Sequence, residues 1–132
     1  MKTRIRPLLG VGLAVSTLVL AAPIAEAAST SSASACSPVV LYGKQICLSV
    51  DQQNVTATMI VQPGGRGWYG HIEIDGPTGQ LLLTKDKMLN NPASWPNSVP
   101  SVGAGQYCAI DWRWDVYHQD YFEENHVCVT VS

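Results

Sequence analysis

The fold is decided most clearly by one stretch of the chain, Trp68-Tyr69-Gly70-His71-Ile72-Glu73-Ile74-Asp75. Apolar or small residues occupy every second position of this stretch, and most of the positions between them are polar. Successive side chains of a β-strand point to opposite faces, so this period of two predicts a strand with one buried face. The buried face is expected to carry Trp68, Gly70, Ile72 and Ile74, and the exposed face Tyr69, His71, Glu73 and Asp75.

Two further stretches, 55–62 and 106–116, show the same alternation. The second stretch has large apolar residues at positions of one parity, which predicts that they form the buried face of a strand. These residues are Cys108, Ile110, Trp112, Trp114 and Val116. Shorter apolar runs predict four more strands, at 39–42, 45–50, 81–84 and 126–131.

Turn-forming residues separate these strands, at 51–54, 63–67 and 76–79. No long stretch of the sequence has a convincing helical period. About seven short strands in roughly 100 residues predict an all-β fold. The expected architecture is a small antiparallel β-sandwich, with a small β-barrel as the alternative.

Two segments interrupt the alternation. Residues 85–101 contain Pro92, Pro96 and Pro100, which exclude a central strand and predict a long loop. Residues 116–125 are crowded with aromatic and acidic side chains, and they are expected to link two antiparallel strands.

The N-terminal residues 1–27 have the pattern of an export signal peptide. A basic start precedes an apolar run over 8–22, and Ala25-Glu26-Ala27 offers a cleavage site. The low-complexity residues 28–35 predict a flexible leader, followed by a disulfide-bonded β domain over 36–132. The protein is therefore expected to be secreted and extracellular, without a membrane anchor after cleavage.

The four cysteines, Cys36, Cys47, Cys108 and Cys128, predict two disulfides, for which three pairings exist. Sequential pairing, Cys36 with Cys47 and Cys108 with Cys128, is favoured. One observation conflicts with it. Cys108 has the parity of the predicted buried face of 106–116, whereas Cys128 lies opposite the apolar valines 127, 129 and 131.

Charge excludes one class of partner. Residues 28–132 contain nine acidic and five basic side chains, and no basic stripe is present. An acidic surface repels phosphate backbones, so a nucleic-acid partner is not expected. No cofactor is expected either, because the glycine-rich segment 63–67 lacks the lysine of a phosphate-binding loop and precedes a predicted strand.

His71, Glu73 and Asp75 stand at alternate positions of one predicted strand. Side chains at this spacing share a face, and from there they could bind one metal ion. The alternative is the ordinary polar face of a half-buried sheet. No serine or cysteine nucleophile stands in a recognisable setting, so an enzymatic role is not favoured.

Aromatic side chains outside the predicted core are candidates for binding, because exposed tryptophan and tyrosine form interaction sites. Trp95 lies in the predicted loop 85–101, although it could also pack back over the core. Residues 116–125 supply the other candidates, which are Tyr117, Tyr121, Phe122, Glu123 and Glu124.

Three short motifs resemble small secreted proteins of Gram-positive actinobacteria that have no assigned activity. The motifs are Tyr69-Gly70-His71-x-Glu73-Ile74-x-Gly76-Pro77, Tyr107-Cys108-x-x-x-Trp112 and Cys128-Val129-x-Val131. The resemblance implies a secreted β domain, and it supplies no catalytic residues and no substrate.

The favoured function is non-catalytic binding outside the cell, through loops at one end of a β-sandwich, to a protein or a cell-wall glycan. One alternative is an inhibitor of an extracellular protease that presents 85–101 like a substrate. The other is a small metal-dependent hydrolase that uses His71 and Glu73. The oligomeric state stays open.

Overall fold

The computed structural model describes residues 31–132. The predicted signal peptide, 1–27, lies outside the described residues, as do residues 28–30 of the predicted leader. In the described part the chain forms strands and no helix. The strands are β1 (Ala33–Cys36), β2 (Lys44–Val50), β3 (Asn54–Val61), β4 (Trp68–Gly76), β5 (Gly79–Leu83), β6 (Lys87–Leu89), β7 (Ala93–Pro100), β8 (Gly105–Asp115) and β9 (Asp120–Val131).

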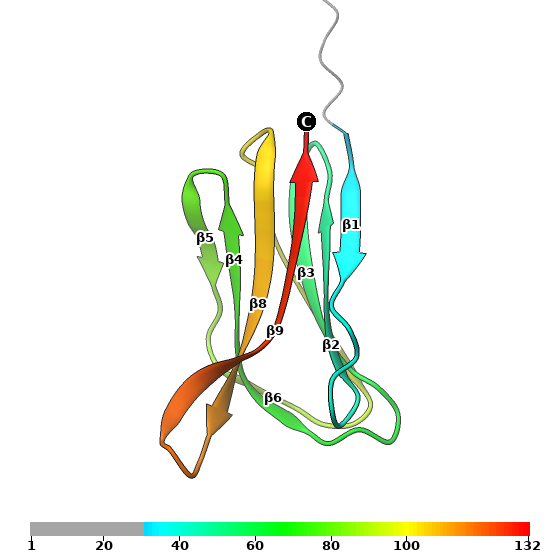
Figure 1. Ribbon diagram of the computed structural model, residues 1–132, viewed down its shortest axis with the longest axis vertical. Helices are drawn as coiled ribbons and strands as arrows, with labels where there is room; N and C mark the ends of the chain where they lie inside the picture. The colour runs from blue at the N-terminus through cyan, green and yellow to red at the C-terminus, as the bar shows by residue number, and fades with distance from the viewer. Residues whose placement is uncertain (1–30) are drawn as a thin grey trace, which may run out of the picture.

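The strands form two antiparallel sheets that face each other (Figure 1). The first sheet has the order β1-β2-β3-β7, and the second has the order β5-β4-β8-β9, with the short β6 also paired to β4. No ladder joins the two sheets within residues 31–132. The predicted β-sandwich is therefore confirmed, and the barrel alternative is wrong. The β8–β9 hairpin projects beyond the sandwich at the end opposite the C-terminus (Figure 1).

The core lies between the two inner faces. On β4 the predicted alternation is confirmed, because Trp68, Ile72 and Ile74 are buried while the residues between them are more exposed. The first sheet contributes the alternate apolar residues of β2 and β3. The buried apolar residues of these two strands are Ile46, Leu48, Val50, Val55, Ala57, Met59 and Val61.

Strand β8 turns the opposite face to the core from the predicted one. Tyr107, Ala109 and Asp111 are buried, whereas Trp112 and Trp114 lie on the outer face. The Tyr107 ring fits in the core because its hydroxyl finds partners in the loop that precedes β8, donating to the Gly103 carbonyl at 2.6 Å. The prediction followed the larger apolar residues and was wrong. The polar groups of Tyr107 and Asp111 are tolerated on the buried face because their hydrogen bonds are satisfied.

Both predicted disulfides form, Cys36–Cys47 and Cys108–Cys128. Each joins residues directly opposite one another on neighbouring strands, with Cα atoms 4.0 Å and 4.1 Å apart. The conflict over Cys108 disappears because the outer face of β8 carries it, on the same side of the sheet as Cys128. The register shift between β8 and β9 lies beyond the disulfide, between Asp111 and Trp112.

Three segments differ from the expectations. Residues 85–101 contain β6 and the edge strand β7, and the loop prediction was wrong because prolines are tolerated at a sheet edge. Residues 39–42, expected as a strand, form a turn with a single bridge between Val40 and Lys44. Residues 33–35, expected in the leader, pair with β2 as part of β1.

Asp111 is fully buried between the sheets. The backbone N–H and side-chain amide of Asn125 donate to its two carboxylate oxygens, at 3.2 Å and 2.8 Å. Burial raises the pKa of the Asp111 carboxyl to about 7, and Glu124 raises it as well, while Asn125 and Lys44 oppose the shift. Between about pH 4 and pH 7 the folded chain therefore holds a proton here that the unfolded chain releases.

The folded protein is expected to lose stability as the pH rises from about 4 to about 7, because the carboxyl of Asp111 ionises freely in the unfolded chain over this range while burial keeps it protonated in the folded chain. Asp111→Asn, which resembles the protonated carboxyl, should remove most of this dependence. Denaturant midpoints of both proteins, measured at pH 5 and pH 8, test the expectation. Equal changes in the two proteins would mean that Asp111 is not the responsible group.

Candidate functional site

The outer faces of the two sheets differ in chemistry. The first sheet exposes small polar residues and prolines, among them Ser49, Thr56, Thr58, Ser94, Pro96 and Ser98. The second sheet carries large rings on its outer face, and we call these residues the aromatic face. They are Tyr69 and His71 of β4, Trp112 and Trp114 of β8, and Tyr121 of β9.

Strand register brings the rings of the aromatic face together. Trp112 lies opposite His71, and Trp114 lies opposite Tyr121. The ring centroids of Trp114 and Tyr121 are 4.9 Å apart, and those of Tyr121 and His71 are 4.5 Å apart. The His71 and Trp112 rings follow at 6.5 Å. These spacings match favourable aromatic contacts, so the rings form a continuous band across three strands.

Asp86, in the connection between β5 and β6, holds one side of this band. Its carboxylate lies 2.9 Å from His71 Nδ1, and it accepts hydrogen bonds from the hydroxyls of Tyr121 and Tyr69. The hydrogen bond from Tyr121 holds the Asp86 pKa below its usual value, and the same bond raises the pKa of Tyr121 to about 12. One carboxylate therefore orients three rings from two strands.

Asp86→Asn is expected to lower the pKa of Tyr121 from about 12 toward the ordinary value of about 10. The reason is that an amide no longer favours the protonated phenol as strongly as a carboxylate does. Ultraviolet absorbance titration, with Tyr121→Phe used to assign the signal, measures the shift. An unchanged Tyr121 pKa in Asp86→Asn would mean that Asp86 does not hold this ring.

Glu73 holds the other side of the band. Trp112 Nε1 donates to its Oε2 at 2.7 Å, and Gln80 Nε2 donates to its Oε1 at 2.6 Å. Asp75 follows on the same strand face, and burial together with repulsion from Glu73 raises its pKa. The aromatic face therefore has carboxylates along its border.

The three predicted metal ligands share one face of β4, and Asp75 interacts with Glu73, but the three side chains do not gather around one point. His71 contacts Asp86, whereas Glu73 contacts Trp112 and Gln80. Within residues 31–132, metal-ligating side chains gather instead at Cys108, His126 and Cys128. The two sulfur atoms of that group are joined in a disulfide, so they are not thiolate ligands.

Trp95 does not lie in a loop. It belongs to β7, opposite Met59 of β3, and its ring centroid is 6.1 Å from that of Trp68. Lys87 Nζ lies 5.1 Å from the centroid of the Trp95 ring. Trp95 was expected either to be exposed for binding or to pack back over the core. The structure shows the second arrangement, because Trp95 packs against the edge of the core.

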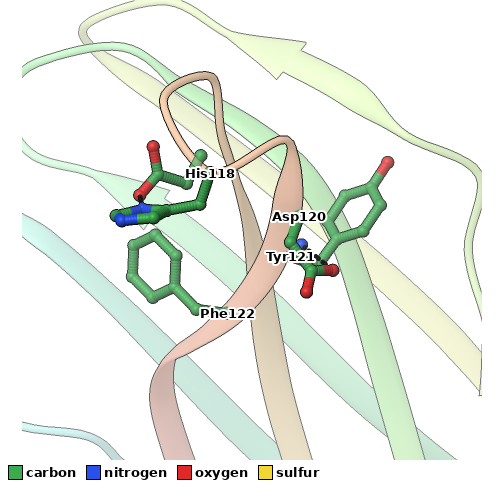
Figure 2. Close-up of a pocket in the computed structure, with 5 residues that line it drawn as sticks. His118, Asp120, Tyr121 and Phe122 are labelled. Atoms are coloured by element: carbon green, nitrogen blue, oxygen red, sulfur yellow. Dashed lines mark hydrogen bonds and ion pairs between the residues drawn. The ribbon is translucent and has the colours of Figure 1, made fainter.

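The β8–β9 hairpin separates the other predicted binding residues. Tyr117 is 92% exposed in the turn, and Tyr121 belongs to the aromatic face. Figure 2 shows Phe122 and His118 on one side of β9 and Tyr121 on the other. A hydrogen bond to Asp115 raises the pKa of His118.

The two predicted glutamates point in different directions. Glu123 is exposed and pairs with His126 at 3.3 Å. Glu124 is the extra residue at the register shift, and its side chain turns inward to Lys44 and Arg113.

Comparison with known protein families, with curated proteins and with solved structures finds no match. None of the described residues belongs to a helix long and apolar enough to cross a membrane. The functional argument therefore depends on the geometry of residues 31–132.

Proposed function

We propose that the protein is a secreted, non-catalytic binding protein that holds a glycan on its aromatic face. The observation that carries this proposal is the contrast between the two outer faces. A band of rings covers one sheet, whereas the outer face of the other sheet carries mostly small polar side chains and prolines, with Ile60 among them and, within residues 31–132, no aromatic ring. Large apolar side chains gathered on one uncovered face are typical of an interaction surface.

The chemistry of the face suits sugar rings. Aromatic side chains offer apolar surfaces on which the flat faces of sugars can stack, and their polar atoms remain available for hydrogen bonds. Glu73 and Asp86 supply acceptors for sugar hydroxyls along the border of the band. The hydrogen bonds that these carboxylates already make fix the rings in advance, which reduces the entropy lost on binding.

The charge of the face restricts the ligand. Its border carries Glu73, Asp75 and Asp86, so a neutral or positively charged glycan is favoured over an anionic polymer. Secretion is supported by the predicted signal peptide and by the two disulfides, because disulfides persist in oxidising compartments outside the cytosol.

The alternative functions gain less support. A protease inhibitor would need residues 85–101 free for presentation, but β7 is hydrogen-bonded to β3 along its length. A metal-dependent hydrolase would need His71, Glu73 and Asp75 to converge, but His71 is held by Asp86, away from the interacting pair Glu73 and Asp75.

Co-sedimentation of residues 28–132 with insoluble polysaccharides tests the proposal. Chitin, cellulose and purified cell-wall peptidoglycan are suitable solids, and dextran sulfate in solution serves as an anionic competitor. We expect saturable retention on at least one solid and no competition by the polyanion. Recovery of the protein in the supernatant with every solid would contradict a glycan-binding function.

A further inference from the structure

A cavity lies between the β1–β2 connection and the second sheet, at the end where the β8–β9 hairpin projects away from the sandwich (Figure 1). Its volume is about 500 Å³, which is in the range of small-molecule sites. The lining residues are Val40, Leu41 and Tyr42 between β1 and β2, Arg113 of β8 and Glu124 of β9. Arg113 alternates with Trp112 and Trp114 along β8, so this cavity opens on the opposite side of the sheet from the aromatic face.

The register shift between β8 and β9 explains why a glutamate lies beside two basic residues at the cavity. Glu124 is unpaired in the ladder, since Asn125 lies opposite Asp111 and Glu123 lies opposite Trp112. An extra residue of this kind bends the strand and redirects its side chain. Glu124 thus turns inward, where its Oε1 lies 3.3 Å from Lys44 Nζ and 3.2 Å from Arg113 Nε.

Positive charge is concentrated at this end of an acidic chain. Of the five basic residues in 28–132, Arg113 lines the cavity, and Lys44 and Arg66 contact residues that line it. The Arg66 guanidinium is 4.2 Å from the Tyr42 ring centroid, and Lys44 Nζ is 5.9 Å from the same ring. Glu124 is the carboxylate paired with Lys44 and Arg113. Asp111 also interacts with Lys44 and Glu124, but burial raises its pKa to about 7, so it adds little negative charge below that pH. Three cations near one paired carboxylate therefore leave an excess of positive charge.

The wall opposite Arg113 is apolar and open to solvent. Leu41 is 81% exposed and Tyr42 is 50% exposed, although neither is needed to fill the core. The Arg113 side chain is 37% exposed and lies over the Phe122 ring at 4.4 Å, which orients its guanidinium. The cavity therefore combines an apolar wall with a held cation.

We propose that this cavity binds a small amphipathic carboxylate, a molecule with one apolar chain or ring and one carboxylate end. The apolar part would pack against Val40, Leu41 and Tyr42. The carboxylate would pair with the guanidinium of Arg113, whose planar geometry suits two parallel hydrogen bonds. The charge excess favours an anion, and the apolar wall favours a molecule with little other polarity.

Calorimetric titration of residues 28–132 with octanoate, octylammonium and octan-1-ol tests the proposal. The three probes share one chain and differ in the charge of the end group. We expect octanoate to bind at least tenfold more tightly than either of the other two. Equal affinities for octanoate and octylammonium, or no binding of octanoate, would overturn the proposal.

Two variants locate the site. Arg113→Gln removes the proposed partner of the carboxylate, and Leu41→Ser removes an exposed part of the apolar wall. Each should weaken octanoate binding at least tenfold, while Tyr121→Ala on the aromatic face should leave it unchanged. If Arg113→Gln does not fold, Leu41→Ser still decides, because its exposed side chain contributes little to the core. Unchanged octanoate binding by Leu41→Ser would overturn the proposal.

Discussion

Gly70→Ala is expected to destabilise the fold strongly. A Cβ atom at position 70 would lie 1.9 Å from the Trp112 carbonyl oxygen and 2.9 Å from the carbonyl carbon. These are backbone atoms of the neighbouring strand β8, which cannot turn aside as a flexible side chain could. Relief requires β4 and β8 to separate where Gly70 lies opposite Arg113. We expect a loss of at least about 3 kcal/mol, the upper end of the usual cost of overpacking.

Gly64→Ala is the matched control. Gly64 has a φ of 84°, and a Cβ atom there meets nothing within 4 Å. This variant should lose about 1 kcal/mol through backbone strain alone. Urea unfolding of the two variants separates a steric cost from a conformational one. Similar losses in both variants would show that the approach of β8 does not require a glycine at position 70.

The second large effect is expected on ligand binding. Trp114→Ala combined with Tyr121→Ala removes two neighbouring rings of the aromatic face, whose centroids are 4.9 Å apart. Loss of two central aromatic contacts should weaken binding of the retained glycan about 100-fold, which corresponds to about 2.7 kcal/mol. Affinity electrophoresis in gels that contain the soluble form of that glycan measures the change.

Tyr117→Ala provides the control for this pair. Tyr117 belongs to the same hairpin and is 92% exposed, but it lies in the turn and not on the aromatic face. Its removal should leave the affinity within about twofold of the original protein, as expected for a residue outside the contact. A loss in Tyr117→Ala as large as in the double variant would move the binding site to the hairpin tip.

The alternation of polar and apolar residues predicted the strands more reliably than it predicted their faces. On β4 the small and aliphatic residues all lie on one face, so only that face could be buried, and the prediction was confirmed. On β8 both faces carry large or polar residues, and the tryptophans favoured the wrong one. The valines of β9 held the missing information. They turn Cys128 outward, so the disulfide requires Cys108 to face outward too, and with it Trp112 and Trp114.

Prolines explain the error over residues 85–101. Proline excludes a central strand because it lacks a hydrogen-bond donor, but this rule allows an edge strand. Pro96 and Pro100 both occur in β7, which forms one edge of the first sheet. The same error placed Trp95 in a loop, whereas the strand directs its ring toward Trp68.

The site itself could be predicted only in part. Tyr121 was a candidate binding residue, and His71 and Glu73 were expected on an exposed face, but no local pattern relates them to Asp86. The carboxylate of Asp86 contacts side chains 15 and 35 positions away along the chain. Such contacts arise from the pairing of β4, β8 and β9, and from the path of the connection between β5 and β6. The spacing of residues along the sequence reveals neither the strand pairing nor the path of this connection.

The central claim is that the aromatic face holds the ligand, and chemical-shift mapping tests it most directly. A soluble oligosaccharide of the retained glycan is titrated into ¹⁵N-labelled residues 28–132. We predict that the largest changes occur at the indole N–H groups of Trp112 and Trp114 and at the amides of β4, β8 and β9 around them. Changes confined to the first sheet or to the hairpin turn, with both indole signals unmoved, would contradict the account.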